Sequence, residues 1–203
     1  MDKKYSDLLC EWLSELGYTK CFYVAGGNIM HMLESANRIF DCIPFVHEVA
    51  AGIAAEYHNE ASTDENEKAF VLVTAGPGLT NLITAISGSF LESRDLLIVG
   101  GQVKSVDLKR PGMRQRGIQE IDGVSLVQSI TKRALRVDTP LPKALIVETI
   151  MQGRQPRKGP IFLEICLDVQ GANLEDKLQN IADNKDRKST RLNSSHANIS
   201  YAV

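Results

Sequence analysis

Two spacings of apolar side chains alternate along residues 4–170, and they predict the fold. Short runs of consecutive apolar residues indicate buried strands, and apolar residues three or four positions apart indicate helices. Six strands are expected, at 20–24, 43–46, 69–74, 96–99, 134–137 and 161–165. Helical periodicity is found at 8–16, 29–39, 48–57, 79–91, 124–130 and 141–155.

The order of these elements indicates the architecture. Strands and helices alternate, and the strands are apolar throughout instead of alternating with polar residues. Such strands are typical of a parallel sheet whose two faces are both covered by helices. We therefore predict an α/β fold with a doubly wound, mainly parallel sheet of about six strands.

Two segments have no apolar periodicity and are predicted to be loops. Ser62–Lys68 is polar and acidic, which is typical of a surface loop. Val103–Glu120 is basic and contains proline and glycine. A long loop inside an α/β domain is usually functional. Its basic side chains suit a phosphorylated ligand or simply face water.

Distinctive residues follow four of the predicted strands. They are Gly26-Gly27, Glu48, Gly76-Pro77-Gly78 and Gly100-Gly101-Gln102, in chain order. Because ligands bind beyond the carboxyl ends of parallel strands, these residues predict one site at one edge of the sheet. Small residues follow Glu48, so its helix can pack closely and Glu48 can lie at a buried junction. The alternative is a helix-start glutamate in water.

A glycine turn before a helix can also bind phosphate. The turn at Gly76–Asn81 lacks the third glycine of a dinucleotide motif, and no P-loop lysine follows it. Pro77 removes one N–H donor, which suits an apolar wall better than a phosphate cradle. Asn81 either points its amide toward the sheet edge or faces water.

The composition of the chain limits the classes of partner and ligand that can be expected. The formal net charge is −2, and no apolar run approaches the roughly 20 residues that span a membrane. Neither nucleic acid nor a membrane is therefore expected as a partner. The four cysteines and four histidines lack metal-ligand spacing, so no metal ligand is expected in this chain. Scattered cysteines suit a reducing compartment, and we expect a cytoplasmic protein.

Four segments together resemble the N-terminal, pyrimidine-binding domain of thiamine-diphosphate-dependent enzymes of the acetolactate synthase type. They are Gly26-Gly27, His47–Glu56, Val71–Asn81, and Gly101–Val103 with Gln119–Asp122. The resemblance covers residues 4–169 and implies catalytic roles for Glu48 and Gln119. Glu48 would share a proton with a ring nitrogen of the cofactor's aminopyrimidine, and Gln119 would reach toward the thiazolium and the substrate. The implied cofactor-binding residues are Gly26, Gly27, Glu48, Gly76, Pro77 and Asn81.

The resemblance also implies the chemistry of a larger protein. Its cofactors would be thiamine diphosphate and Mg²⁺, with FAD possible, and its substrate a 2-oxo acid such as pyruvate. The expected activity is that of a 2-oxo acid carboligase or decarboxylase. In this family the site forms between two subunits, which implies a homodimer or tetramer through this domain. The family's diphosphate-binding GDG segment is not found in these 203 residues. We therefore expect the chain alone to be an inactive fragment; a nucleotide-binding module is the other non-enzyme alternative.

Two positions depart from the synthases proper. These have Tyr-Pro before the two glycines and Phe before the Gln-Glu pair, where this chain has Val24-Ala25 and Ile118. The loop at 114–122 is similar to relatives found with surface-polysaccharide pathways. Those relatives transfer a pyruvate-derived acetyl unit to a nucleotide keto sugar, which is the alternative activity.

The predicted domain spans 1–170, and a polar linker begins at 171–185. Residues 186–203 resemble the conceptual translation of a common short-read sequencing adapter. The alternative is a disordered polar tail. We exclude 186–203 from the fold prediction and expect the chain to be the front of a longer protein.

Overall fold

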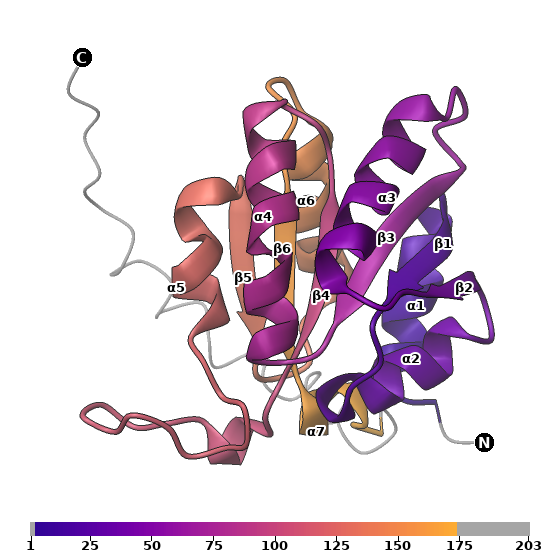
Figure 1. Cartoon of the computed structure of the whole chain (residues 1–203). Coiled ribbons are helices and arrows are strands. Elements are labelled where there is room, and N and C mark those ends of the chain that lie inside the picture. Colours follow the sequence, from indigo (N-terminus) through magenta and orange to yellow (C-terminus); the bar gives the residue numbers. More distant parts are fainter. Residues whose placement is uncertain (1–2, 174–203) are drawn as a thin grey trace, which may run out of the picture. The chain divides into compact units, whose positions relative to one another are not determined.

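A six-stranded parallel sheet lies at the centre of the chain, with the strand order β2-β1-β3-β4-β6-β5 (Figure 1). Every neighbouring pair is parallel. The strands are β1 (Tyr18–Tyr23), β2 (Asp41–Pro44), β3 (Lys68–Val73), β4 (Leu97–Gln102), β5 (Arg133–Val137) and β6 (Ile161–Cys166). The predicted α/β class, parallel sheet and strand number are confirmed.

This computed structural model describes residues 3–173. Within them, Lys4–Ala172 forms one compact unit. The predicted linker from residue 174 onward and the predicted tail at 186–203 lie outside the described residues.

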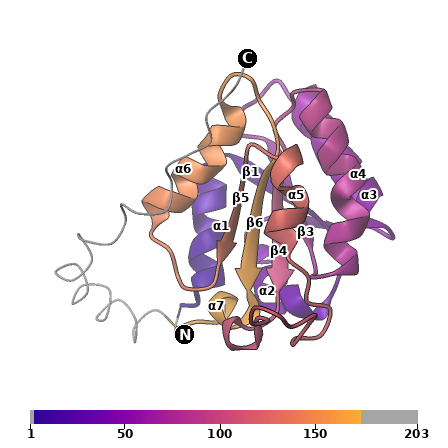
Figure 2. The same cartoon turned by 90° about the vertical axis from the view of Figure 1, so that its left-hand side faces the viewer.

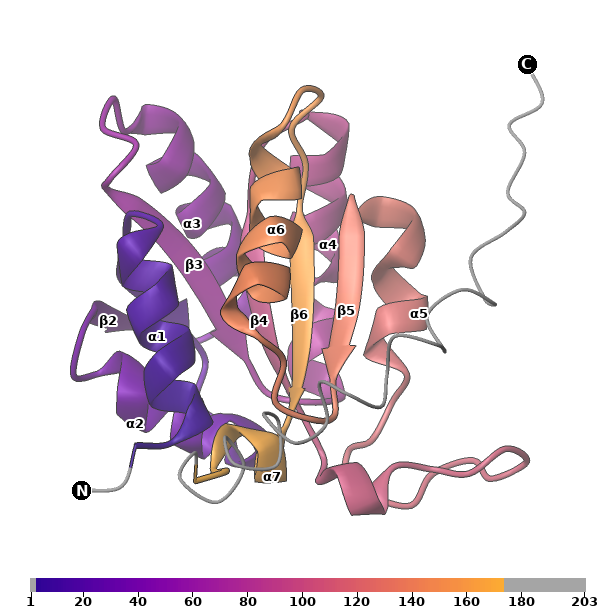
Figure 3. The same cartoon turned by 180° about the vertical axis from the view of Figure 1, so that it is seen from behind.

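Helices cover both faces of the sheet (Figures 2 and 3). One face carries α3 (Glu48–Ala61), α4 (Pro77–Leu91), α5 (Gly123–Val127) and the 3₁₀ turn η3 (Gln128–Ile130). The other face carries α1 (Tyr5–Glu15), α2 (Met30–Ala36) and α6 (Lys143–Arg154). The short elements η1 (Gly27–Ile29), η2 (Ser105–Asp107) and α7 (Leu167–Gln170) lie near the carboxyl ends of the strands.

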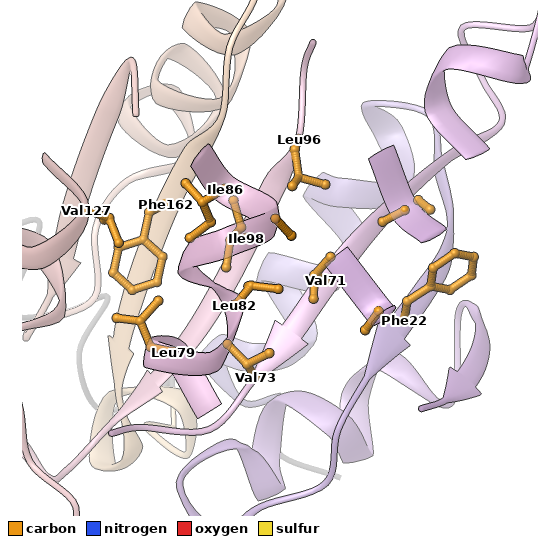
Figure 4. Packing of buried hydrophobic residues seen from close by; sticks show 14 residues of the cluster. Phe22, Val71, Val73, Leu79, Leu82, Ile86, Leu96, Ile98, Val127 and Phe162 are labelled. Atoms are coloured by element: carbon orange, nitrogen blue, oxygen red, sulfur yellow. The ribbon is translucent and has the colours of Figure 1, made fainter. Parts of the chain in front are cut away.

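The core beneath α3 and α4 explains why these helices pack so closely on the sheet (Figure 4). Val71 and Ile98 of the central strands are fully buried under Leu82 of α4. A β-carbon placed on Gly52 of α3 would lie 2.5 Å from the β-carbon of Ala85 on α4. The two helices can therefore be this close only because their facing residues are small.

The path of the chain through the sheet determines where a ligand can bind. From β1 the chain moves outward to β2, and it then returns to place β3 on the other side of β1. The connections from the carboxyl ends of β1 and β3 therefore leave on opposite faces of the sheet. In a doubly wound sheet such a switch point opens the crevice in which ligands bind.

Two predicted strands have different bounds in the structure. β2 pairs with β1 over Asp41–Pro44, so Phe45 and Val46 lie beyond it, and Val46 is fully exposed. An apolar run alone cannot show where sheet pairing stops. β4 continues beyond the predicted bound at Val99, because Gly100 and Gly101 pair with β6.

The glycines of β4 allow close packing on both sides of the strand. A β-carbon on Gly100 would lie 2.6 Å from the Phe162 ring, and one on Gly101 would lie 2.1 Å from the carbonyl oxygen of Asn28. The predicted bounds 96–99 were therefore too short, and Gly100-Gly101-Gln102 forms the carboxyl end of β4. Gln102 ends β4 and is fully buried.

Candidate functional site

Glu48 is the first residue of α3 and lies at the edge of the sheet where the strands end. The imidazole Nδ1 of His47 accepts a hydrogen bond from the Val49 N–H at 3.2 Å and so caps this helix. The Glu48 side chain is buried, with 8% of the residue exposed. Its Oε2 accepts a hydrogen bond from Asn81 Nδ2 at 2.9 Å. The prediction of Glu48 at a buried junction is confirmed, and Asn81 points its amide toward it.

Glu48 has little other compensation for its burial. Within residues 3–173 its carboxylate forms no ion pair, and Oε1 has no hydrogen-bond partner. A β-carbon placed on Gly78 would lie 3.7 Å from this oxygen. Carboxylates are seldom buried without a cation or several donors. The site therefore holds a carboxylate oxygen that is available to a ligand.

The turn after β3 is arranged around Thr74. β-carbons placed on Gly26 and Gly78 would lie 2.4 Å and 3.0 Å from Thr74 side-chain atoms. The Thr74 hydroxyl also accepts a hydrogen bond from the Asn28 N–H at 3.3 Å. One threonine therefore joins the glycine turns that follow β1 and β3, the two strands at the switch point.

Gln119 reaches this turn from the long loop between β4 and β5. Gly76 has a φ of +64°, and a β-carbon there would lie 2.5 Å from the carbonyl oxygen of Gln119. Gln119 itself has a φ of +62° and is exposed. A non-glycine residue in the left-handed region is unusual and often marks a functional position. The structure thus brings the two predicted residues Gly76 and Gln119 into contact.

A buried glutamine fixes the turn after β1. Gln170 Nε2 donates to the carbonyl oxygens of Asn28 at 2.8 Å and Ile165 at 2.9 Å. Its Oε1 accepts from the Met32 N–H at 3.4 Å. Gly26 lies beneath this turn against Thr74, whereas a β-carbon on Gly27 would have nothing within 4 Å. Of the two predicted glycines, only Gly26 packs against the rest of the site.

Thr74 and Gln170 were not among the predicted site residues. The sequence could have indicated Thr74 as a site residue, since it is the polar residue that ends a continuous apolar run. It could not have indicated Gln170, because the partners of Gln170 lie up to 142 residues away in the chain. Pro77, which was predicted, is exposed at the first position of α4.

The long loop is fastened at Glu120. This carboxylate accepts hydrogen bonds from the backbone N–H groups of Lys109, Arg116 and Gly117 at 2.5, 2.8 and 3.0 Å. Burial opposes the charge, but these three donors outweigh it and hold the pKa of Glu120 below its ordinary value. The loop next to Gln119 is therefore folded back on a charged group.

A second charged group anchors the end of the loop. Arg136 of β5 donates to Glu164 of β6 at 2.6 Å and to Asp122 at 2.8 Å. Burial raises the pKa of Glu164, although Arg136 opposes this. A cavity of about 300 Å³ lies between this group and the loop. Its lining includes Lys109, Arg110, Glu120, Asp122 and Arg136.

Neither membrane nor metal features occur in this part of the chain. No helix among residues 3–173 is long and apolar enough to cross a membrane. The same residues contain no group of three or more histidine, cysteine or acidic side chains that could hold a metal ion.

Comparison with known proteins decides the family. Residues 3–126 match the family model described as "Thiamine pyrophosphate enzyme, N-terminal TPP binding domain". The chain belongs to this family. The resemblance inferred from Glu48 and the glycine turns is therefore confirmed.

Several relatives are similar over most of the chain. It is 30% identical over 169 residues to the acetolactate synthase large subunit of Lactococcus lactis, which covers 81% of this chain and 28% of that protein. It is 30% identical over 172 residues to chloroplastic acetolactate synthase 1 of Nicotiana tabacum, covering 83% and 24%. It is 29% identical over 169 residues to 2-hydroxyacyl-CoA lyase 2 of Caenorhabditis elegans, covering 80% and 24%. The chain thus spans about a quarter of the length of these relatives.

The residues present fit an aminopyrimidine ring. A flat heteroaromatic ring needs a firmly placed backbone with open space beside it. Gly26 and Gly78 pack against Thr74, Gly76 packs against Gln119, and Gly27 has open space beside it. A ring nitrogen needs one polar partner, and Glu48 has an oxygen without a partner in the described residues. We therefore consider thiamine pyrophosphate compatible with this edge of the sheet.

Proposed function

We propose that this chain provides the aminopyrimidine half of a thiamine-diphosphate site in a 2-oxo acid carboligase or decarboxylase. The observation that carries the proposal is the buried Glu48 carboxylate, which has one neutral donor and no cation among residues 3–173. When bound, the cofactor would supply a carbanion-stabilising group for cleavage or formation of a carbon–carbon bond.

Glu48 would hold or share a proton at Oε1, the oxygen not bound to Asn81. Asn81 fixes the plane of the carboxylate through its 2.9 Å hydrogen bond to Oε2. The small residues that follow Glu48 let α3 pack tightly on α4, and 8% of Glu48 remains exposed. Desolvation strengthens a hydrogen bond between Glu48 and a ring nitrogen because the surrounding dielectric is low.

Gln119 is proposed to reach the substrate side of the same pocket. Its backbone touches Gly76 and its side chain is exposed, so the amide is free to meet a ligand. The contact with Gly76 fixes the position of Gln119 relative to the turn after β3. The proposed cofactor contacts are Gly26, Gly27, Glu48, Gly76, Pro77 and Asn81.

The other half of the site is proposed to come from a diphosphate- and Mg²⁺-binding domain of a partner subunit in a homodimer or tetramer. Two apolar side chains at this edge support a covering partner, because Val46 is fully exposed and Ile118 is 84% exposed. Each is within two residues of a proposed catalytic residue. A partner subunit that covers this edge would bury both side chains.

The substrate is proposed to be a 2-oxo acid such as pyruvate. The alternative acceptor, a nucleotide keto sugar, is supported by Lys109 and Arg110, which line the loop cavity. Cations of this kind bind phosphate groups. FAD in the complete protein and a cytoplasmic location are also proposed; the free thiols of Cys10, Cys21, Cys42 and Cys166 support a reducing compartment.

The proposal is tested with the full-length protein that carries this chain. Glu48→Gln keeps the acceptor for Asn81 but removes the ionisable group. We expect it to lower turnover of pyruvate by about 10²-fold or more, which is the usual contribution of a positioned acid–base group. Steady-state kinetics with saturating thiamine diphosphate and Mg²⁺ measure this effect.

The matched control is Glu60→Gln, which makes the same chemical change on the exposed part of α3. Its turnover should equal that of the unchanged protein. Near-normal turnover of Glu48→Gln would contradict the catalytic role of Glu48.

Product analysis separates the two substrate proposals. Acetolactate formed from pyruvate alone supports the synthase, and product formed only with a nucleotide keto sugar supports the transferase. Calorimetry on the 203-residue chain gives a further test. Tight thiamine diphosphate binding by this chain alone would contradict the half-site, and adenine-nucleotide binding would support a nucleotide-binding module.

A further inference from the structure

Three cysteines lie together on the face of the sheet that carries α1, away from the cofactor site. Cys21 of β1 and Cys42 of β2 are direct partners in the parallel ladder. Cys10 of α1 is close enough for its charge to interact with that of Cys42. Cys10 and Cys21 are buried, whereas Cys42 is partly exposed on the edge strand.

The pairing places Cys21 and Cys42 at disulfide distance. Neighbouring strands lie about 4.8 Å apart, and paired residues point to the same face of the sheet. Disulfides join residues whose Cα atoms are about 4.4–6.8 Å apart. Among residues 3–173, β2 is a four-residue strand at the edge of the sheet with β1 as its one neighbour, so β2 can shift to bring the two sulfurs into bonding contact.

The two thiols already interact in the reduced chain. The neighbouring Cys21 thiol lowers the pKa of Cys42 below its usual value. The interaction with Cys42 and burial together raise the pKa of Cys21. The more exposed member of the pair is thus the one with more thiolate character, and thiolate is the reactive form.

We propose that Cys21 and Cys42 form a redox-active dithiol, in which peroxide oxidises Cys42 and Cys21 resolves it to a disulfide across the β1–β2 edge. This inference is independent of the proposed function. The disulfide would link the edge strand β2 covalently to β1. Gly26 lies five residues after Cys21, and Glu48 lies six residues after Cys42, so the link would lie close to the turns that carry these two site residues.

The chemistry balances with hydrogen peroxide as the oxidant. The Cys42 thiolate attacks one peroxide oxygen, the O–O bond breaks, and the hydroxide released takes a proton to become water. Cys42 is then a sulfenic acid. The Cys21 sulfur attacks the Cys42 sulfur, the S–O bond breaks, and the leaving hydroxide takes the Cys21 proton. Two thiols are oxidised by two electrons, and one peroxide is reduced to two waters.

The tryptic map of the chain makes the test specific. Each cysteine falls in a different tryptic peptide: Cys10 in 5–20, Cys21 in 21–38, Cys42 in 39–68 and Cys166 in 159–177. The folded 203-residue chain is treated with hydrogen peroxide, alkylated and digested. We expect peptides 21–38 and 39–68 to appear joined, with a mass lower by two hydrogens than their sum. Titration in denaturant should find two of the four thiols lost, and a dithiol reductant should restore them.

Single variants assign the roles. Cys42→Ser should keep all three remaining thiols under the same treatment. Cys21→Ser should leave Cys42 as a sulfenic acid that a cyclic dione captures, and Cys21→Ala gives the same measurement without a buried hydroxyl. Cys10→Ser and Cys166→Ser should still form the 21–42 link.

Three results would overturn the proposal. They are four intact thiols after treatment of the folded chain, a disulfide that joins Cys10 to Cys21 or Cys42, or a link that forms only in denaturant.

Discussion

Lys68 at the amino ends of the strands and Glu48 at the carboxyl ends are both buried, but they differ in their partners. At the amino ends of the strands, Lys68 is 4% exposed, and its Nζ lies 3.1 Å from Glu65 and 3.6 Å from Asp95. Arg154 lies 3.7 Å from Asp95 and donates to the carbonyl oxygen of Leu16 at 2.8 Å. This edge is a network in which opposite charges meet.

At the carboxyl ends, Glu48 is buried to a similar degree but has only the neutral Asn81 as a partner in the described part of the chain. A network of paired charges is explained by stability alone. A buried carboxylate whose one partner is neutral is not explained by charge pairing, and such positions are typical of functional sites. We therefore interpret Lys68 as a charge that stabilises the fold and Glu48 as a charge that serves function. Four substitutions test this interpretation.

The largest effect is expected from Lys68→Met at the amino-end edge. It leaves the Asp95 carboxylate with Arg154 as its remaining cation in the network, and breaking a buried pair costs about 3 kcal/mol. Urea denaturation measures the loss in free energy of unfolding. Lys20→Met is the control, because the Lys20–Asp41 pair is exposed and should contribute less than about 1 kcal/mol. Equal effects of the two variants would contradict the structural role of Lys68.

The next effect is expected from Gly76→Ala at the carboxyl-end edge. The φ of +64° and the 2.5 Å approach to the Gln119 carbonyl both oppose a side chain, and we expect a loss of about 2 kcal/mol. The loop that carries Gln119 should also be cleaved faster by trypsin at Arg114 and Arg116. Gly27→Ala has open space and should change stability by less than about 0.5 kcal/mol. If both variants behave alike, the contact between Gly76 and Gln119 is not what orders the loop.

A smaller, pH-dependent effect is expected from Glu120→Gln. Its carboxylate accepts three backbone hydrogen bonds, and losing the charge should cost about 1 kcal/mol at neutral pH. The folded pKa lies below the ordinary 4.5, so this stability is present above pH 4.5 and is lost as the pH falls through the folded value. Urea denaturation at several pH values should show the two proteins converging below pH 4.5. A difference that stays constant across that range would argue against the charge as its cause.

The smallest effect on stability is expected from Glu48→Gln. A glutamine still accepts the hydrogen bond from Asn81, and no cation in the described residues loses a partner. The free energy of unfolding should therefore change by less than about 0.5 kcal/mol, even though turnover of the full-length protein falls. A loss as large as that of Lys68→Met would place Glu48 among the structural charges.

The sequence alone determined the elements and most of the candidate site. Six strands, their parallel arrangement and the glycine turns follow from patterns within a few residues, because strand and helix periodicities are local. The prediction of Glu48 at a tight helix start rested on the small residues that follow it, and the structure has it buried there.

Tertiary structure decided the features that depend on contacts between residues far apart in the chain. Lys68 was assigned to a surface loop, yet it begins β3 and is buried, because Asp95 and Glu65 come to meet it. The roles of Thr74 and Gln170 also depend on distant contacts, because they order the glycine turns through partners 46 and 142 residues away in the chain. The order of the strands selects which turns become neighbours, and β1 and β3 meet only because the chain reverses direction across the sheet. Local patterns determine the elements, whereas the contacts that form the site depend on how those elements pack.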